Sequence, residues 1–210
     1  MAVKPFCSGS RKDVRLLSSA QDYELPESVV NPYHFPRPVA PGVCAASEGI
    51  ELDDVVARIH AARQRCDVLL VEGAGGLMVP LTRTVHVVDL IKALEVPAVV
   101  VAANKLGTIN HTLLTLDALK ARKISVCKVV LMNQRRADAS ASKNDQIIKE
   151  NRPFAGVIRI PFLGDAARCF EALKKIEKKV QKTIAQVLEP DTFCAPSERR
   201  VARPLQIEAR

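Results

Sequence analysis

The stretch that most constrains the fold is residues 66–76, which read Cys-Asp-Val-Leu-Leu-Val-Glu-Gly-Ala-Gly-Gly. The apolar run at 68–71 predicts a strand that is buried on both faces of a parallel sheet. Glu72 ends the run, and the glycine-rich segment 73–76 follows at once. In open α/β sheets this edge is where ligands bind, and glycines there let the backbone approach them. A carboxylate at such an edge can hold Mg²⁺ and, through it, phosphates. The alternative is a glycine-rich turn with a capping Glu and no ligand.

A second stretch strengthens the ligand-binding interpretation. Residues 98–111 read Ala-Val-Val-Val-Ala-Ala-Asn-Lys-Leu-Gly-Thr-Ile-Asn-His. The pattern predicts another buried strand, a glycine turn and then the start of a helix, with Thr108 as its N-cap. A helix N-terminus at this place would suit a carboxylate.

The elements alternate regularly along the chain. Strands are predicted at 68–72, 98–103 and 125–132, about thirty residues apart, with helices at 87–95 and 109–121 between them. This βαβ spacing predicts an α/β fold with a mostly parallel sheet and right-handed crossovers. The proline-rich segment 22–49 is expected to be an extended loop. The other expected elements are helices at 51–65, 140–150 and 166–188 and a short strand at 156–160.

Length and composition describe one ordinary globular domain. The chain has 210 residues, of which 48% are hydrophobic and 26% charged. No apolar run approaches the ~20 residues needed to cross a bilayer, and Met1 to Ser10 lack the apolar core of a signal peptide. We therefore expect a cytoplasmic protein with no membrane partner. Residues 1–188 are expected to form the α/β domain and residues 189–210 a flexible basic tail.

The charge and the cysteines exclude other classes of site. The net charge is +8, but aromatic residues make up only 4% of the chain, so a solvated basic face is favoured over a nucleic-acid site. The six cysteines form no Cys-x-x-Cys pair, and the four histidines have no His-x-x-x-His spacing. We expect reduced thiols and no zinc site.

Two motifs together carry a family resemblance. Val-Glu-Gly-Ala-Gly-Gly-Leu-Met-Val-Pro-Leu at 71–81 and Lys-Leu-Gly-Thr-Ile-Asn-His-Thr-Leu-Leu-Thr at 105–115 resemble dethiobiotin synthetase over about residues 2–165. The resemblance implies a P-loop NTPase-like fold with helices on both faces of the sheet. It also implies a reaction in which 7,8-diaminopelargonate takes up CO₂, ATP phosphorylates the resulting carbamate, and the neighbouring amine closes a cyclic urea, dethiobiotin. The implied partners are Mg²⁺, ATP, CO₂, the diamino acid and a second copy of the chain.

The resemblance assigns roles near the start of the chain. Lys4, in the pattern Lys-Pro-x-x-Ser-Gly, matches the catalytic lysine, and Ser8 matches a serine that contacts the substrate. Asp13 and Glu72 match the carboxylates that hold Mg²⁺ at the nucleotide site. Without the family, Lys4 would be interpreted as a solvated strand-end lysine, Ser8 as a turn residue and Asp13 as a helix cap.

Two further sets of residues follow from the same resemblance. The substrate's carboxylate tail would be gripped across a dimer interface by Leu106, Gly107, Thr108, Ile109 and Asn110. The nucleotide would contact, besides Asp13 and Glu72, the residues Gly73, Ala74, Gly75, Asn133, Gln134, Pro161, Phe162 and Leu163. Within the second set Asn133 would read adenine, because its amide can both donate and accept a hydrogen bond.

The sequence departs from the family in one respect. The family opens with a strand and a phosphate loop of the form Gly-x-x-x-x-x-Gly-Lys-Thr, which these 210 residues do not contain. We expect the chain to lack that inner strand and, as written, to be a poor ATPase, because removing even one anion-stabilising donor costs about 10²–10³ in rate. Either the loop is encoded upstream of Met1, or the chain is a catalytically dead paralogue that acts as a dimerisation partner. An amide-forming ATPase of the same superfamily is a third possibility, which the Leu-Gly-Thr-Ile-Asn-His motif disfavours.

Overall fold

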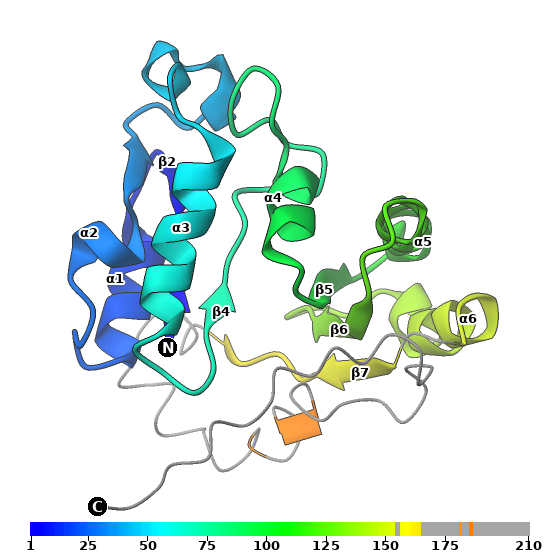
Figure 1. Cartoon of the computed structure of the whole chain (residues 1–210). Helices are drawn as coiled ribbons and strands as arrows, with labels where there is room; N and C mark the ends of the chain where they lie inside the picture. Colours follow the sequence, from blue (N-terminus) through cyan, green and yellow to red (C-terminus); the bar gives the residue numbers. More distant parts are fainter. Residues whose placement is uncertain (154–155, 165–180, 182–184, 187–210) are drawn as a thin grey trace, which may run out of the picture.

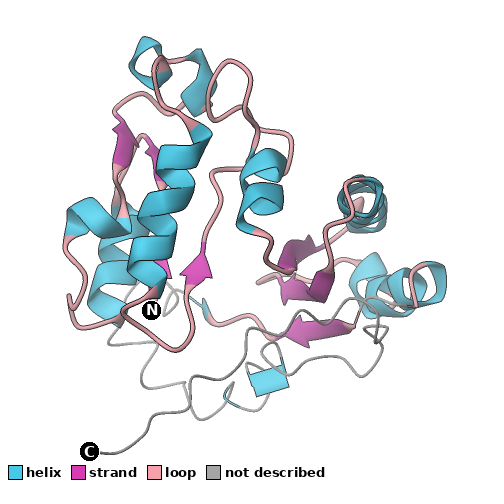
Figure 2. Ribbon diagram, viewed as in Figure 1, coloured by secondary structure: helices cyan, strands magenta, loops and turns pink. Residues whose placement is uncertain are grey.

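The computed structural model of the chain describes residues 1–153 and 156–164, together with 181, 185 and 186. The predicted helix at 166–188 therefore lies almost entirely outside the described residues, and the predicted tail at 189–210 lies wholly outside them. The described part is an α/β structure in which every strand ladder is parallel (Figures 1 and 2). None of its helices is long and apolar enough to cross a membrane.

The first strands form two short parallel pairs. β1 (Ala2–Val3) pairs with β4 (Leu70–Val71), and β2 (Phe6–Ser8) pairs with β3 (Tyr33–Phe35). Pro5 stands between β1 and β2, where it cannot donate a ladder hydrogen bond. Because the chain runs directly from β1 into β2, these pairs place the ends of β4 and β3 on either side of one segment.

The third group of strands is the most regular. β5 (Ala98–Asn104), β6 (Val126–Asn133) and β7 (Val157–Ile160) form a parallel sheet in that order. The register aligns Asn104 with Asn133 and Met132 with Ile160, so that all three strands end at one edge. One face packs on α5 and α6 through a buried cluster of Leu116, Val129, Leu131, Ile148 and Val157.

Helices connect these strands at close to the predicted positions. Gly107, the N-cap of α5, has φ at +90°, a backbone conformation that glycine adopts without steric cost. The N–H of His86 donates to the Asp89 carboxylate at the start of α4. The α-helices are α1 Lys12–Ala20, α2 Glu27–Val30, α3 Leu52–Arg63, α4 Val87–Leu94, α5 Thr108–Ala121 and α6 Asn144–Asn151. The short 3-10 helices are η1 Pro41–Val43, η2 Ala45–Ser47 and η3 Ala139–Ser142.

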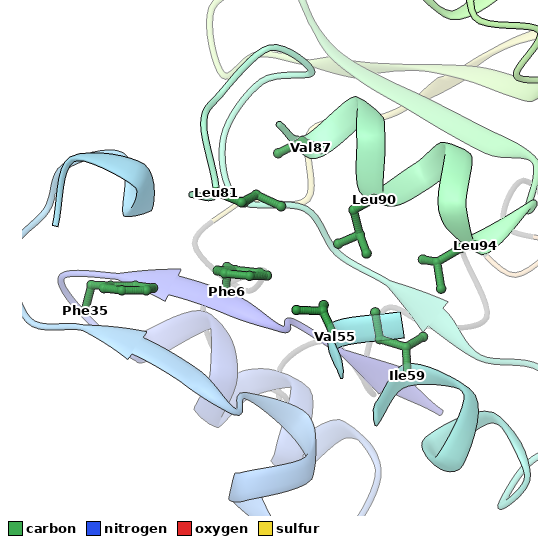
Figure 3. Close-up of a cluster of buried hydrophobic side chains, with 8 residues drawn as sticks. All are labelled: Phe6, Phe35, Val55, Ile59, Leu81, Val87, Leu90 and Leu94. Carbon is green, nitrogen blue, oxygen red and sulfur yellow. The ribbon is translucent and has the colours of Figure 1, made fainter. Parts of the chain in front are cut away.

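The largest core cluster joins β2 and β3 to α3 and α4 (Figure 3). The rings of Phe6 and Tyr33 stack with centroids 4.9 Å apart. The cluster's buried members are Phe6, Phe35, Val55, Ile59, Leu81, Val87, Leu90 and Leu94. Burial of this many large apolar side chains fixes the first strands, and with them the residues at their ends.

The sequence-based prediction was wrong about two details of the strands. Residues 68–71 are not buried on both faces: only Leu70 and Val71 pair, and the side chains of Val68 and Leu70 are more than half exposed. Val101 on β5 is likewise 63% exposed. The physical reason is the same in both places, because no described element covers the face that carries these side chains.

The segment 22–49, expected to be a loop, contains α2 and β3.

The sheet is interrupted between β4 and β5. Among the described strands β4 pairs only with β1, and β5 pairs only with β6, so each has one unpaired edge. A cavity of about 460 Å³ lies there, lined from one side by Val71, Gly73 and Gly75 and from the other by most of β5. Unpaired strand edges beside an apolar cavity are the surfaces on which another strand can add.

Candidate active site

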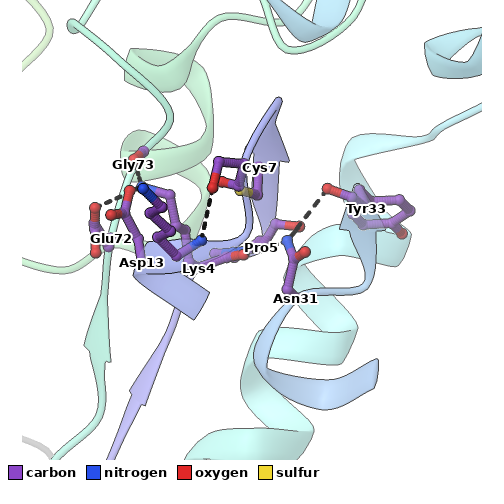
Figure 4. Close-up of polar contacts among 10 residues, drawn as sticks. Lys4, Pro5, Cys7, Asp13, Asn31, Tyr33, Glu72 and Gly73 are labelled. Atoms are coloured by element: carbon purple, nitrogen blue, oxygen red, sulfur yellow. Dashed lines mark hydrogen bonds and ion pairs between the residues drawn. The ribbon is translucent and has the colours of Figure 1, made fainter. Parts of the chain in front are cut away.

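Two parallel strands bring together the predicted lysine and carboxylates. Since Val3 is aligned with Val71, the residues that follow them, Lys4 and Glu72, leave their strands side by side. Lys4 Nζ lies 2.5 Å from a Glu72 carboxylate oxygen and 3.7 Å from an oxygen of Asp13, which belongs to the first turn of α1 (Figure 4). The lysine side chain is only 10% exposed, whereas both carboxylates are about half exposed or more. The three predicted residues therefore form one charged cluster where β1 and β4 end.

The backbone at Lys4 is held by Asn31, which sequence reasoning did not identify. Asn31 is 2% exposed, and its Nδ2 donates to the carbonyl oxygens of Lys4 at 2.8 Å and of Pro5 and Tyr33 at 3.3 Å (Figure 4). Its Oδ1 accepts from Arg11, whose guanidinium is paired with Glu27. An asparagine next to a proline in an extended segment carries no signal of this role in the sequence.

The predicted substrate serine is the last residue of β2. Ser8 Oγ is buried and has no hydrogen-bond partner among the described residues. A buried hydroxyl without a partner is costly, so a polar ligand atom that reached it would satisfy it.

Burial raises the pKa of the neighbouring Cys7 thiol, and Lys4 opposes that rise. Cys7 is thus a packed thiol beside the cluster and not an activated nucleophile.

The glycine-rich turn after Glu72 adopts a conformation that needs glycine. Gly75 has φ at +77°, and a Cβ at that position would lie 3.0 Å from a methyl group of Val79. Lys4 Nζ also lies 3.3 Å from the carbonyl oxygen of Gly73. The turn therefore stands directly beside the charged cluster, as the sequence predicted.

The turn before α5 differs from the prediction in its capping. The N-cap is Gly107, not Thr108, whose N–H donates to the Lys105 carbonyl oxygen. The N–H of Leu106 donates to Asp138 Oδ2 at 2.7 Å, so it is already used. Hydrogen bonds from Ser140 and from Leu106 hold the pKa of the Asp138 carboxyl below its ordinary value. Asp138, which sequence reasoning missed, thus anchors this turn to the loop after β6.

The residues predicted to contact the base lie at the end of the β5–β6–β7 sheet. Asn133 ends β6, and Pro161 follows the aligned end of β7, so the two segments are neighbours. Phe162 is 46% exposed. The Gln134 side chain donates to the Met132 carbonyl oxygen at 2.8 Å. An amide, a proline and an exposed aromatic ring at one sheet edge can accommodate a flat heterocycle.

The cavity between β4 and β5 connects the glycine-rich turn at 73–76 with the segment at 105–111. Its lining includes Gly73 and Gly75 from the glycine-rich turn and Lys105, Thr108 and His111 from the turn and first residues of α5. The segment at 73–76 and the segment at 105–111 therefore face a common space, although 28 residues, 77–104, separate them in the chain.

Comparison with known proteins agrees with this geometry. The model of a family described as AAA domain matches residues 2–168. An ATP-dependent dethiobiotin synthetase BioD from Nitrosopumilus maritimus is 30% identical over 189 residues, covering 84% of this chain and 81% of the relative. One from Bacillus velezensis is 34% identical over 168 residues, covering 77% and 70%.

The chain belongs to the dethiobiotin synthetase family. A third relative of this name, from Sulfurovum sp., is 46% identical over 96 residues, which is 46% of each chain. Against this relative and the Bacillus licheniformis enzyme, the chain spans about half of the curated protein's length, 46% and 57%. Residues from both motifs, at 71–81 and 105–115, line part of the cavity.

The residues present fit the metal that the dethiobiotin synthetase family implies. Asp13 and Glu72 supply carboxylate oxygens within 4 Å of Lys4 Nζ, at 3.7 Å and 2.5 Å, and both side chains are open to solvent. Mg²⁺ is commonly bound by one or two carboxylates together with water and phosphate oxygens. Among the described residues, no group of three or more His, Cys, Asp or Glu side chains is placed to hold a metal ion.

Proposed function

We propose that this chain carries much of the active site of an ATP-dependent ligase that closes dethiobiotin from 7,8-diaminopelargonate and CO₂. The observation that carries the proposal is the cluster of Lys4, Asp13 and Glu72 beside the glycine-rich turn. The glycine-rich turn beside this cluster lines the same cavity as the α5 turn, which carries the second motif. The names of the matched relatives support the choice of reaction.

Each residue has a role that its charge and position suit. An amine of the substrate attacks CO₂ and loses a proton to give a carbamate; a carbamate oxygen then attacks the γ-phosphorus of ATP, and ADP leaves. Lys4, only 10% exposed, would balance the negative charge of carbamate and γ-phosphate. The second amine attacks the carbamoyl carbon, and phosphate leaves. Ser8 would accept or donate a hydrogen bond at the substrate, and the Gly73–Gly75 backbone would border the phosphates.

Asp13 and Glu72 would hold Mg²⁺, which screens the charge of the triphosphate when bound. In the structure Lys4 instead pairs with both carboxylates, closely with Glu72 at 2.5 Å and more loosely with Asp13 at 3.7 Å. The same lysine can therefore serve two partners, its carboxylates when the site is empty of substrate and the carbamate when the site is filled.

The interrupted sheet supports a further part of the proposal. A strand that paired with the open edges of β4 and β5 would fill the cavity and end beside the turn at 73–76 and the turn at 105–107. We propose that the complete site includes such a strand, followed by a phosphate-binding loop, supplied by a segment outside these 210 residues. The phosphate loop would provide the donors that the described residues do not offer to a triphosphate.

The surface of α5 supports a homodimer as the working assembly. Leu106 is 79% exposed and Leu114 is 61% exposed, an unusual exposure for two leucines on one short segment. Large exposed apolar side chains often mark protein interfaces, and two-fold dimers use the same patch on both subunits. In this proposal Leu106 to Asn110 meet the substrate tail at that interface. The N–H of Leu106 would take no part in this contact, because it already donates to the Asp138 carboxylate.

The test compares two proteins in one product assay. The first is the 210-residue chain, and the second is an extended chain in which a strand and a Gly-x-x-x-x-x-Gly-Lys-Thr loop precede Met1. We expect Mg-ATP and diamino acid to yield dethiobiotin at a rate at least 10²-fold higher in the extended chain. An extended chain whose loop lysine is replaced by alanine is the matched control and should resemble the short chain. Equal inactivity of short and extended chains would favour a catalytically dead dimerisation partner, and full activity of the short chain would contradict the role given to the loop.

A further inference from the structure

Three asparagines form a buried hydrogen-bonded series behind the predicted base site. Asn104 ends β5, Asn133 ends β6 and Asn144 begins α6. Asn144 Nδ2 donates to Asn104 Oδ1 at 2.8 Å, and Asn104 Nδ2 donates to Asn133 Oδ1 at 2.8 Å. Asn104 and Asn144 are each 1% exposed, whereas Asn133 is half-buried. The series therefore runs from the interior outwards and ends on the residue expected to read the base.

Backbone carbonyls determine which way each amide faces. An asparagine's oxygen and nitrogen must be assigned from their partners, and a carbonyl oxygen can only accept. Asn104 Nδ2 also donates to the Ala141 carbonyl oxygen at 3.0 Å, and Asn144 Nδ2 lies 3.4 Å from that of Lys105. A flipped Asn104 would place oxygen against oxygen at both Ala141 and Asn133. The direction of the whole series is thus fixed at its buried end.

The fixed direction of the series decides which amide groups of Asn133 remain available to a ligand. Its Oδ1 must face inwards to accept from Asn104, so its Nδ2 faces away from Asn104. Nδ2 has no hydrogen-bond partner within the part of the chain that the structure describes. One lone pair of Oδ1 is used by Asn104, and the other is left. The side chain of Asn133 therefore presents two N–H donors and one acceptor lone pair to a ligand. The positions of its nitrogen and oxygen cannot be exchanged.

We propose that Asn104 and Asn144 are positioning residues that hold Asn133 with its amide nitrogen toward the nucleotide base, so that the site selects a purine whose N7 accepts and whose 6-substituent donates. Adenine offers this pair to an asparagine in a bidentate arrangement. Guanine presents two acceptors along the same edge, and its O6 would face Asn133 Oδ1. This inference rests on the proposed function, because it needs a nucleotide at Asn133.

The first measurement tests the orientation without any ligand. Side-chain amide protons of the three asparagines are assigned by NMR in the 210-residue chain, and their exchange with solvent is followed. We expect slow exchange for Asn104 and Asn144 and exchange at least about tenfold faster for Asn133, whose protons have no acceptor among the described residues. Protected Asn133 protons together with rapidly exchanging Asn104 protons would overturn the proposed direction.

The second measurement tests base selection. Binding of Mg-ATP and of Mg-7-deaza-ATP, which lacks the N7 acceptor, is titrated by NMR on the same chain at millimolar ligand. We expect ATP to bind about tenfold more tightly, as loss of one such hydrogen bond implies. Equal affinity would overturn the base-reading part. Absence of binding by both nucleotides would refute it together with the proposed site, and the exchange pattern would still decide the orientation.

Variants separate positioning from a general structural role. Asn104→Asp replaces the inward donor by an acceptor, so Asn133 should turn its Nδ2 inwards and the preference for ATP over 7-deaza-ATP should disappear. Asn104→Ala is the second variant, in case a buried carboxylate prevents folding; it should speed exchange at Asn144 and weaken the preference. Asn151→Asp, on the exposed end of the same helix α6, is the matched control and should leave the preference unchanged. A folded Asn104 variant with undiminished preference would contradict the positioning role.

Discussion

Lys4 Nζ lies 2.5 Å from Glu72 Oε1, across the ends of two strands that are 68 residues apart in the chain. The contact exists because β1 and β4 are parallel and in a register that aligns Val3 with Val71. A parallel pair places both carboxyl ends at one edge, so charged residues that follow the strands must meet. Asn31 donates a hydrogen bond to the backbone carbonyl oxygen of the lysine, and the carboxylates of Asp13 and Glu72 pair with its Nζ.

Replacing Lys4 should impair chemistry more than binding. In the extended enzyme, we expect Lys4→Ala to lower kcat by about 10²–10³ while the ATP dissociation constant changes less than tenfold, because the charge is needed most when the carbamate is phosphorylated. Steady-state kinetics and nucleotide titration provide the two values. Lys12→Ala, an exposed lysine on α1, is the control and should leave both unchanged. An equal loss in affinity and in kcat would contradict the assigned role.

Replacing Glu72 should change the magnesium requirement. Glu72→Gln keeps the shape of the side chain but removes the charge that pairs with Lys4 and would hold Mg²⁺. We expect the magnesium concentration for half-maximal activity to rise about tenfold, with the maximum rate only partly recovered. The measurement is a magnesium titration at fixed ATP. Glu24→Gln, at an exposed position outside the cluster, should titrate like the parent, and an identical curve for Glu72→Gln would remove Glu72 from the metal site.

Replacing Asn31 should destabilise the first strands. Asn31→Ala leaves the carbonyl oxygens of Lys4 and Pro5 without their donor in a buried place, which costs about 1–3 kcal/mol of unfolding free energy. Urea denaturation of the 210-residue chain measures the loss. Asn151→Ala removes a comparable donor at an exposed helix end and should cost much less. Equal losses for the two variants would show that Asn31 does not brace Lys4.

Asp138 should make stability depend on pH. Its pKa is lower in the folded chain than the ordinary value of 3.8, first through Ser140 and then through the N–H of Leu106. The carboxylate's contribution is therefore full above the ordinary value and is lost as pH falls through the lowered one. We expect Asp138→Asn to be less stable than the parent at neutral pH and the difference to shrink in acid. Thermal unfolding at both pH values checks this, and a difference that stays constant would contradict it.

Much of the architecture follows from the sequence. The apolar runs ending in Glu72, Asn104 and Asn133, about thirty residues apart, are sufficient to predict parallel strands, because βαβ spacing leaves few alternatives. The motifs at 71–81 and 105–115 together indicated the family, and the comparisons confirmed it. The sequence also predicted that Lys4, Asp13 and Glu72 belong to one site, and the structure brings these three together. Their catalytic and metal-binding roles stay predictions.

What the sequence could not supply is the set of residues that act through long-range contacts. Asn31, Asn104, Asn144 and Asp138 are ordinary polar residues in local terms, and each has a partner that lies 27 to 40 positions away. Local patterns predict strands and helix starts because those depend on near neighbours. A hydrogen bond to a distant carbonyl depends on strand register, and the exposure of Val68 and Val101 depends on which elements cover them. Both are properties of the tertiary structure, because only packing decides which distant groups meet and which faces stay open.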